Sequence, residues 1–235
     1  MTGSSHMRYF WDAVVADKTR DTKFLKPLLA HHSDEKSFTP IVFAQNYFAR
    51  DVAAYINFLC SDIQYDLKHG STPANYTVVF ETGAWDTTYW FPRLVMNVTA
   101  PALLETIREA VITGCGAYLR LIWVTALPYP HCDLFGMPEQ SIHCEENRYG
   151  RNNYAIAAFN EFFRKSLEEI NYPNLQIVDA FDIVEPRLEF GETGPCGHHY
   201  YCRESCKEKF TATPAGRIVV EAIERAICKA ADGKG

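Results

Sequence analysis

Four runs of consecutive apolar residues divide the chain, and each ends at a polar or turn-forming stretch. They are PIVFAQN (40–46), TVVFETG (77–83), LRLIWVTAL (119–127) and LQIVDAF (175–181). The apolar residues are largely continuous rather than alternating with polar ones, as in strands that have both faces covered by helices. The pattern therefore predicts four buried strands of a parallel sheet.

Helical periodicity fills most of the chain between these runs. Apolar residues recur at spacings of three and four in the segments 51–68, 100–113 and 152–170. A further helix is predicted near the C-terminus, where Thr213 offers an N-cap oxygen and Pro214 suits the first helical turn. Strands and helices thus alternate along the sequence.

This alternation predicts an α/β fold, a three-layer α/β/α sandwich with a central parallel sheet. The chain has 235 residues, of which 47% are hydrophobic, so we expect one large core and a single domain over residues 1–235. In such sheets ligands bind beyond the carboxyl ends of the strands. The candidate positions are therefore near Asn46, within 83–86 and within 126–131.

The charge and the length of the apolar runs exclude two classes of partner. The sequence has 23 basic and 29 acidic residues, a net charge of -6, and no long basic run that could bind nucleic acid. No apolar run approaches the roughly 18 to 20 residues that cross a bilayer. We expect neither a nucleic-acid partner nor a membrane span in this chain.

Cysteines and glycosylation sequons favour an oxidising compartment. The sequence has eight cysteines and two sequons, Asn75-Tyr76-Thr77 and Asn97-Val98-Thr99. Together they predict a disulfide-bonded glycoprotein of the secretory pathway lumen or the extracellular space. Cys132 and Cys144 could close the long surface loop that we predict over 128–151.

The N-terminal stretch Gly3-Ser4-Ser5-His6-Met7-Arg8 has two interpretations. Gly, Ser, His and Met are what cloning tags leave behind. The stretch also resembles the first block of the SGNH (GDSL-like) hydrolases, and more narrowly the Gly-Asp-Ser-x-x-Arg pattern of the PC-esterase branch, with its trichome-birefringence-like and NXPE-like proteins. Gly3, Ser5 and Arg8 match that pattern, whereas Ser4 replaces its aspartate. Because the match extends to Arg8, we interpret the stretch as native sequence.

Later blocks of the SGNH family also have counterparts here. VVFETGAWD at 78–86 is similar to the third block, but Trp85 stands where the family usually has asparagine. The fifth block, usually Asp-x-x-His-Tyr/Trp, resembles 196–200 and puts His199 in the catalytic place. A second alignment puts His198 there instead, and neither alignment supplies the aspartate of this block.

The resemblance implies a flavodoxin-like strand order and a serine hydrolase mechanism. It implies a strand before Gly3, which we expect to be missing from this sequence. Ser5 is the implied nucleophile, and His199, or His198 in the second alignment, is the implied base, because a serine hydroxyl needs an imidazole within hydrogen-bond reach.

The remaining candidate residues would bind the substrate or the oxyanion. The backbone N–H groups of Ser5 and Gly83 are the implied oxyanion donors, and Asn46 is a further candidate because it ends a predicted strand. Arg8 could anchor a substrate or a carboxylate, and Trp85 could stack on a sugar ring.

The sequence therefore predicts a serine-dependent acyl-ester hydrolase or O-acyltransferase that acts on O-acetylated glycans or similar esters, with no metal or organic cofactor. Two alternatives stay open. The departures at Ser4, Trp85 and Cys196 fit an inactive glycan-binding or interaction domain of the same fold. The thiols and imidazoles between Cys196 and Cys206 could hold a structural zinc.

Overall fold

The computed structural model describes residues 2–3, 44–45, 49–89, 95–129, 152–188, 201–203 and 210–228. The strands of its main sheet are β1 (Thr2–Gly3), β2 (Ala44–Gln45), β3 (Tyr76–Glu81), β4 (Leu119–Val124) and β5 (Leu175–Val178). The longer helices are α2 (Ala49–Lys68), α5 (Ala100–Ile112), α6 (Asn153–Ile170), α7 (Ala180–Leu188) and α8 (Pro214–Cys228). Shorter elements are α3 (Ala84–Tyr89), the π-helix η1 (Val95–Thr99), the 3₁₀ turn η2 (Cys115–Ala117) and the antiparallel pair β6 (Tyr201–Arg203) and β7 (Phe210–Ala212).

The main sheet is parallel throughout, with the strand order β2-β1-β3-β4-β5. This is the flavodoxin-like order, and the predicted α/β fold class is confirmed. β1 has only two residues, and Thr2 lies opposite Ala44 of β2 and Phe80 of β3. A two-residue strand thus occupies the place where we expected a missing one, and the extent of the single domain stays a prediction.

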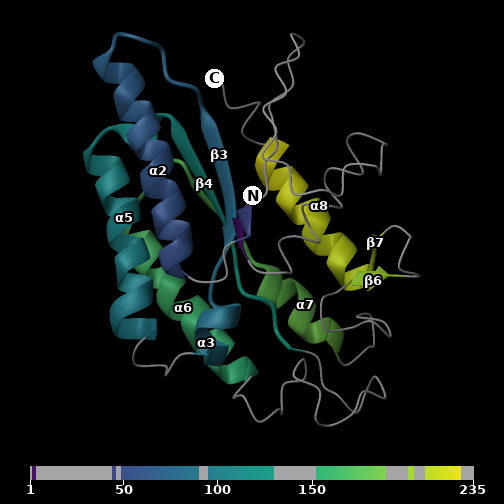
Figure 1. The fold of residues 1–235 in the computed structure, drawn as a ribbon. Helices are drawn as coiled ribbons and strands as arrows, with labels where there is room; N and C mark the ends of the chain where they lie inside the picture. Colours follow the sequence, from purple (N-terminus) through teal and green to yellow (C-terminus); the bar gives the residue numbers. More distant parts are fainter. Residues whose placement is uncertain are drawn as a thin grey trace.

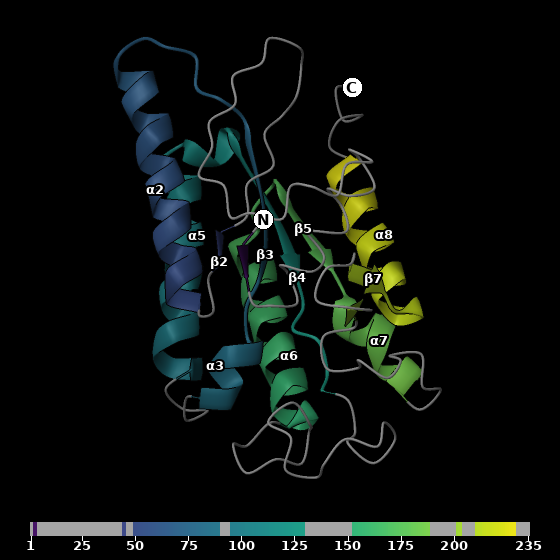
Figure 2. The ribbon, with the colours of Figure 1, turned by 45° about the vertical axis from the view of Figure 1, so that its right-hand side comes forward.

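Alternate residues of the strands contribute to two cores, one on each face of the sheet. Phe80 and Trp123 pack with residues of α2, α5 and α6. Val79 and Ile122 pack with residues of α7 and α8. Successive side chains of a strand point to opposite faces, so continuous apolar runs fit strands that are covered on both sides. The ribbon shows α2 and α5 on one side of the sheet and α7 and α8 on the other (Figure 1, Figure 2).

The predicted elements appear with shorter strands. Each predicted run overlaps one of the strands β2 to β5, and the predicted helices correspond to α2, α5, α6 and α8. The run 175–181 holds both β5 and the start of α7, because only Asp179 separates Val178 from Ala180. A buried strand followed at once by a short helix gives one continuous apolar run, which hides the boundary.

No helix within the described ranges has the length and hydrophobicity needed to cross a membrane.

One disulfide joins two described cysteines, Cys60 of α2 and Cys115 of η2, which are 55 residues apart in the sequence. Both residues belong to the core between α2, α5 and the sheet. Cys228, the last residue of α8, is exposed and has a free thiol. The predicted pair Cys132 and Cys144 lies outside the described residues.

Removing this disulfide is expected to destabilise the protein. The double variant Cys60→Ala, Cys115→Ala should lower the free energy of unfolding by about 2–4 kcal/mol, because the cross-link restricts the unfolded chain over a long loop. Equilibrium urea unfolding measures the change. Cys228→Ala is the control and should unfold like the parent; a double variant as stable as that control would contradict the prediction.

Candidate active site

The strand order reverses beside β1, which lies between β2 on one side and β3 on the other. In open parallel sheets, ligands bind outside the carboxyl ends of the strands at such a reversal. Gly3 ends β1, and Glu81 ends the neighbouring strand β3. The residues after these two strands are therefore the first candidates for a binding or catalytic role.

Gly83 follows β3 in a conformation that only glycine adopts readily. Its φ is 114°, and a Cβ built on it would lie 2.5 Å from the ring of Phe159 in α6 and 3.3 Å from Cβ of Ala126. The backbone after β3 therefore lies directly against α6. A side chain at position 83 would clash and would strain the backbone as well.

A buried carboxylate holds the turn after β3. Asp86 is fully buried, and its Oδ2 accepts hydrogen bonds from Oγ1 of Thr82 at 3.0 Å, the backbone N of Gly83 at 3.3 Å and the backbone N of Ala49 at 3.2 Å. Ala49 is the first residue of α2, so the carboxylate satisfies one of the N–H groups that the start of a helix leaves without a partner. Asp86 thereby joins the β3–α3 turn to the start of the helix after β2.

Burial raises the pKa of Asp86, and the hydrogen bonds from Thr82, Ala49 and Gly83 oppose that shift only in part. Burial disfavours the charged form of a carboxyl group, whereas donors favour it. The Gly83 N–H, a predicted oxyanion donor, already has an acceptor in this arrangement.

The turn after β4 is fixed to α3 and α6 by reciprocal hydrogen bonds. Tyr129 donates its hydroxyl to the carbonyl of Ala84 at 2.9 Å. The side chain of Asn153 accepts from the Tyr129 N–H at 2.7 Å and donates to the Tyr129 carbonyl at 2.9 Å. The chain after β4 is therefore held close to the first residue of α3.

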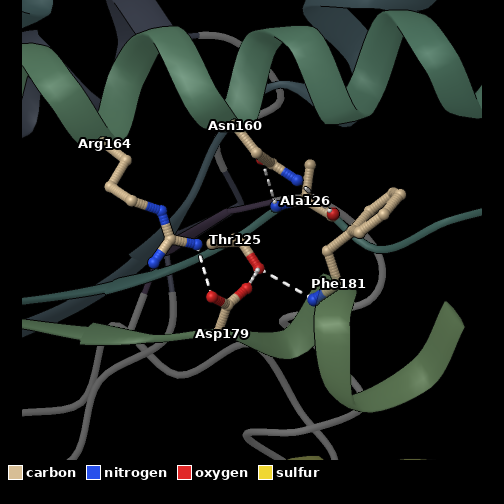
Figure 3. Close-up of polar contacts among 6 residues, drawn as sticks. All are labelled: Thr125, Ala126, Asn160, Arg164, Asp179 and Phe181. Atoms are coloured by element: carbon tan, nitrogen blue, oxygen red, sulfur yellow. Dashed lines mark hydrogen bonds and ion pairs between the residues drawn. The ribbon is translucent and has the colours of Figure 1, made fainter.

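A second polar network joins the ends of β4 and β5 to α6 (Figure 3). The amide of Asn160 accepts from the Ala126 N–H and donates to the Ala126 carbonyl, both at 3.0 Å. Asp179 forms an ion pair with Arg164 of α6. Oγ1 of Thr125 lies 3.4 Å from Asp179 Oδ1 and accepts from the backbone N of residue 181 at 2.8 Å. These side chains hold the ends of β4 and β5 against α6, which is a structural role.

The structure describes two of the predicted site residues. Gly83 lies in the turn after β3, and the backbone of Trp85 lies in the first turn of α3. Five others lie outside the described residues: Ser5, Arg8, Asn46, His198 and His199. Their proposed roles stay predictions.

No group of three metal-ligating side chains that could hold an ion occurs within the described residues. The stretch that could bind zinc, Cys196 to Cys206, lies outside them except for the backbone of β6.

The sequence alone assigned no role to two residues at this edge of the sheet, although Asp86 lies within the candidate positions 83–86. Asp86 lies three residues after Gly83, and an acidic or amide side chain at this spacing often accepts from the backbone N–H that precedes a helix. This signal was available. Asn160 is a buried polar residue on the apolar face of α6, and its partner Ala126 is 34 residues away, so local sequence gives no sign of it.

No family model matches the chain, and no curated protein matches it. Among solved structures, the chain is similar to LAE5, an alpha/beta hydrolase enzyme from the metagenome of Lake Arreo, Spain, with 11% sequence identity and a TM-score of 0.46. The similarity covers 96% of this chain and 92% of that chain. At this level of similarity the comparison gives no argument about function, so the SGNH resemblance rests on its motifs alone.

Proposed function

We propose that the chain is a serine-dependent acyl-ester hydrolase or O-acyltransferase of the SGNH type, with O-acetylated glycans or similar esters as substrates. The observation that carries the proposal is the position of β1. Gly3 ends this strand at the reversal of the strand order, next to β3. Ser5 follows two residues later, and two residues extend at most about 7 Å, which supports a nucleophile at this edge.

In the proposed mechanism, Oγ of Ser5 attacks the ester carbonyl while His199, or His198, accepts the hydroxyl proton. The Ser5 and Gly83 N–H groups stabilise the oxyanion. The imidazole then protonates the leaving alcohol, and water or a sugar hydroxyl releases the acyl group. The fifth block lacks its aspartate, so Ser5 and the histidine act as a catalytic dyad without the third residue of a triad.

One observation favours a second candidate, a non-catalytic glycan-binding domain. The Gly83 N–H lies 3.3 Å from the Asp86 carboxylate, which competes with an oxyanion for this donor. Trp85 occupies the place of the family's asparagine, the other donor of the third block. Such a domain would bind glycans at the same edge without forming an acyl intermediate.

Covalent labelling with a fluorophosphonate probe tests the proposal. The folded protein should take up one probe per chain, and Ser5→Ala should take up none, because the probe reacts with an activated serine hydroxyl. Ser61→Ala is the matched control, since Ser61 is an exposed serine of α2, and it should be labelled like the parent. His199→Ala and His198→Ala identify the base, because the variant that removes it should lose labelling.

Two results would count against the enzyme. Absence of labelling in well-folded protein that still binds an acetylated glycan would favour the binding domain. Equal labelling of the parent and Ser5→Ala would exclude Ser5 as the nucleophile.

We also propose that the chain works in the secretory lumen or outside the cell. The Cys60–Cys115 disulfide supports this, since protein disulfides persist mainly in oxidising compartments.

A further inference from the structure

We propose that Asn75 carries an N-linked oligosaccharide, and that its occupancy exceeds that of Asn97. This inference rests on the proposed secretory compartment but not on the proposed enzymatic activity. Both residues begin an Asn-x-Thr sequon, yet the fold presents the two sequons in different ways.

The first sequon lies where β3 begins, and its two functional side chains face the solvent. Asn75 and Thr77 are both exposed, whereas Tyr76 between them is half-buried and Val78 after them is buried. Side chains two residues apart in an extended chain lie on the same face. The amide of Asn75 and the hydroxyl of Thr77 are therefore presented together.

Tyr76 fixes this orientation. Its backbone N donates to the carbonyl of Tyr118 at 2.8 Å, and its hydroxyl donates to Asp62 of α2 at 2.7 Å. Because the Tyr76 side chain is held toward α2, the side chains on either side of it are directed away from that helix.

The end of α8 explains why Thr77 is exposed. Thr77 lies opposite Arg120 in the pairing of β3 with β4. The Arg120 guanidinium donates to the carbonyl of Ala226 at 2.6 Å and to that of Ile227 at 3.3 Å, near the last residue of α8. The helix that packs on this face thus ends within reach of Arg120, the residue opposite Thr77.

The second sequon is folded differently. Asn97 is exposed but lies within the π-helix η1, and Thr99 at the end of that helix is only 6% exposed. Residues two apart on a helix do not share a face. Once the chain has folded, the Thr99 hydroxyl is no longer presented beside the Asn97 amide, so only the Asn75 sequon remains open to modification after folding.

A glycan at Asn75 would leave the candidate active site open. Asn75 precedes the amino end of β3, and Gly83 follows its carboxyl end. Gly83 is six positions after Thr77, and six steps of extended chain span about 20 Å. The oligosaccharide would extend from the opposite end of the sheet.

The modification requires a polyprenyl-pyrophosphate-linked oligosaccharide as the donor and the membrane-bound transferase that uses it. Nδ2 of Asn75 forms a bond to C1 of the first sugar, and the bond between C1 and the pyrophosphate oxygen breaks. The lipid pyrophosphate leaves with the bonding electron pair, and one amide proton passes to a base of the transferase.

The test uses the protein purified from its natural source, or expressed from its complete natural gene in a eukaryotic host. Enzymatic removal of the glycan in H₂¹⁸O converts a glycosylated Asn to ¹⁸O-labelled Asp, and peptide mass spectrometry then gives the labelled fraction at each sequon. The expected result is a labelled Asn75 peptide, at a higher fraction than the Asn97 peptide.

Two substitutions at the exposed residue Thr77 distinguish loss of the sequon from loss of the fold. Thr77→Ala should remove the label from Asn75, and Thr77→Ser should keep it, because serine preserves the sequon. Both variants should retain the Cys60–Cys115 disulfide, which reports correct folding.

Three results would overturn the inference. One is an unlabelled Asn75 in protein that contains the disulfide, and the second is a labelled fraction at Asn97 equal to or above that at Asn75. The third is an unlabelled Asn75 with free thiols at Cys60 and Cys115, which would also overturn the proposed compartment. The state of the disulfide thus tells the two failures apart.

Discussion

Replacing Gly83 by alanine is expected to lower the free energy of unfolding by about 2–6 kcal/mol, with two causes. A non-glycine residue at a φ of 114° costs about 1–3 kcal/mol of backbone strain. Forcing a methyl group to within 2.5 Å of the Phe159 ring costs about 1–3 kcal/mol more, because the core between β3 and α6 is closely packed. Chemical denaturation of the variant measures the sum.

Two control variants separate these causes. Gly70→Ala also introduces a side chain at positive φ, 73°, but nothing lies within 4 Å of the new Cβ, so it should show backbone strain alone. Adding Phe159→Leu should reduce the effect of Gly83→Ala below the sum of the two single changes, since leucine leaves room for the methyl group. If Gly83→Ala proved as mild as Gly70→Ala, the close approach of α6 would be refuted.

Replacing Asp86 by alanine is expected to lower the free energy of unfolding by at least about 3 kcal/mol, since it leaves three buried donors without their acceptor and unsatisfied buried donors cost about 1–3 kcal/mol each. The donors are the Thr82 hydroxyl and the backbone N–H groups of Gly83 and Ala49. Asp86→Asn is the matched variant. Its carbonyl oxygen in the place of Oδ2 can accept from all three, so most of the stability should return.

The pH dependence of the unfolding free energy separates the effect of the Asp86 charge from the effect of its hydrogen bonds. Burial raises the pKa of Asp86 above its value in the unfolded chain, so the folded state binds the proton more tightly. This contribution to stability is therefore complete at pH below the unfolded pKa, about 3.9, and is lost as the pH rises through the higher folded pKa.

The neutral amide of Asp86→Asn does not titrate. The unfolding free energy of the parent minus that of Asp86→Asn should therefore fall as the pH rises from 4 toward neutrality. Urea unfolding of both proteins across that range measures it. If the parent's value minus the variant's stayed constant or rose with pH, the buried carboxyl would not have a raised pKa.

The layer structure could be predicted from the sequence because both faces of the sheet are covered. The pairs Val78 and Val79 in β3, and Leu121 and Ile122 in β4, contribute to opposite cores, so the apolar runs are continuous and easily recognised. β1 could not be found in this way. Two residues, Thr2 and Gly3, give no periodicity, and they form a strand only because β2 and β3 lie on either side.

The candidate site was predicted less completely. The strand-end rule directs attention to Gly83 from the sequence alone. The clash that excludes a side chain there comes from Phe159, a residue 76 positions later on α6, and no local pattern reveals it. The contact of Asp86 with Ala49 likewise depends on how α2 and α3 are placed by the sheet. Such contacts follow from the topology rather than from the residues themselves.

In the proposed enzyme, a hydroxyl near the start of the chain and an imidazole near its end meet at the carboxyl edge of the sheet. The decisive measurement is the distance from Ser5 Oγ to the nearest ring nitrogen of His199 or His198 in a crystal structure. We expect a separation of about 3 Å, somewhat longer without a bound ligand. A structure with these side chains at different edges of the sheet would contradict it.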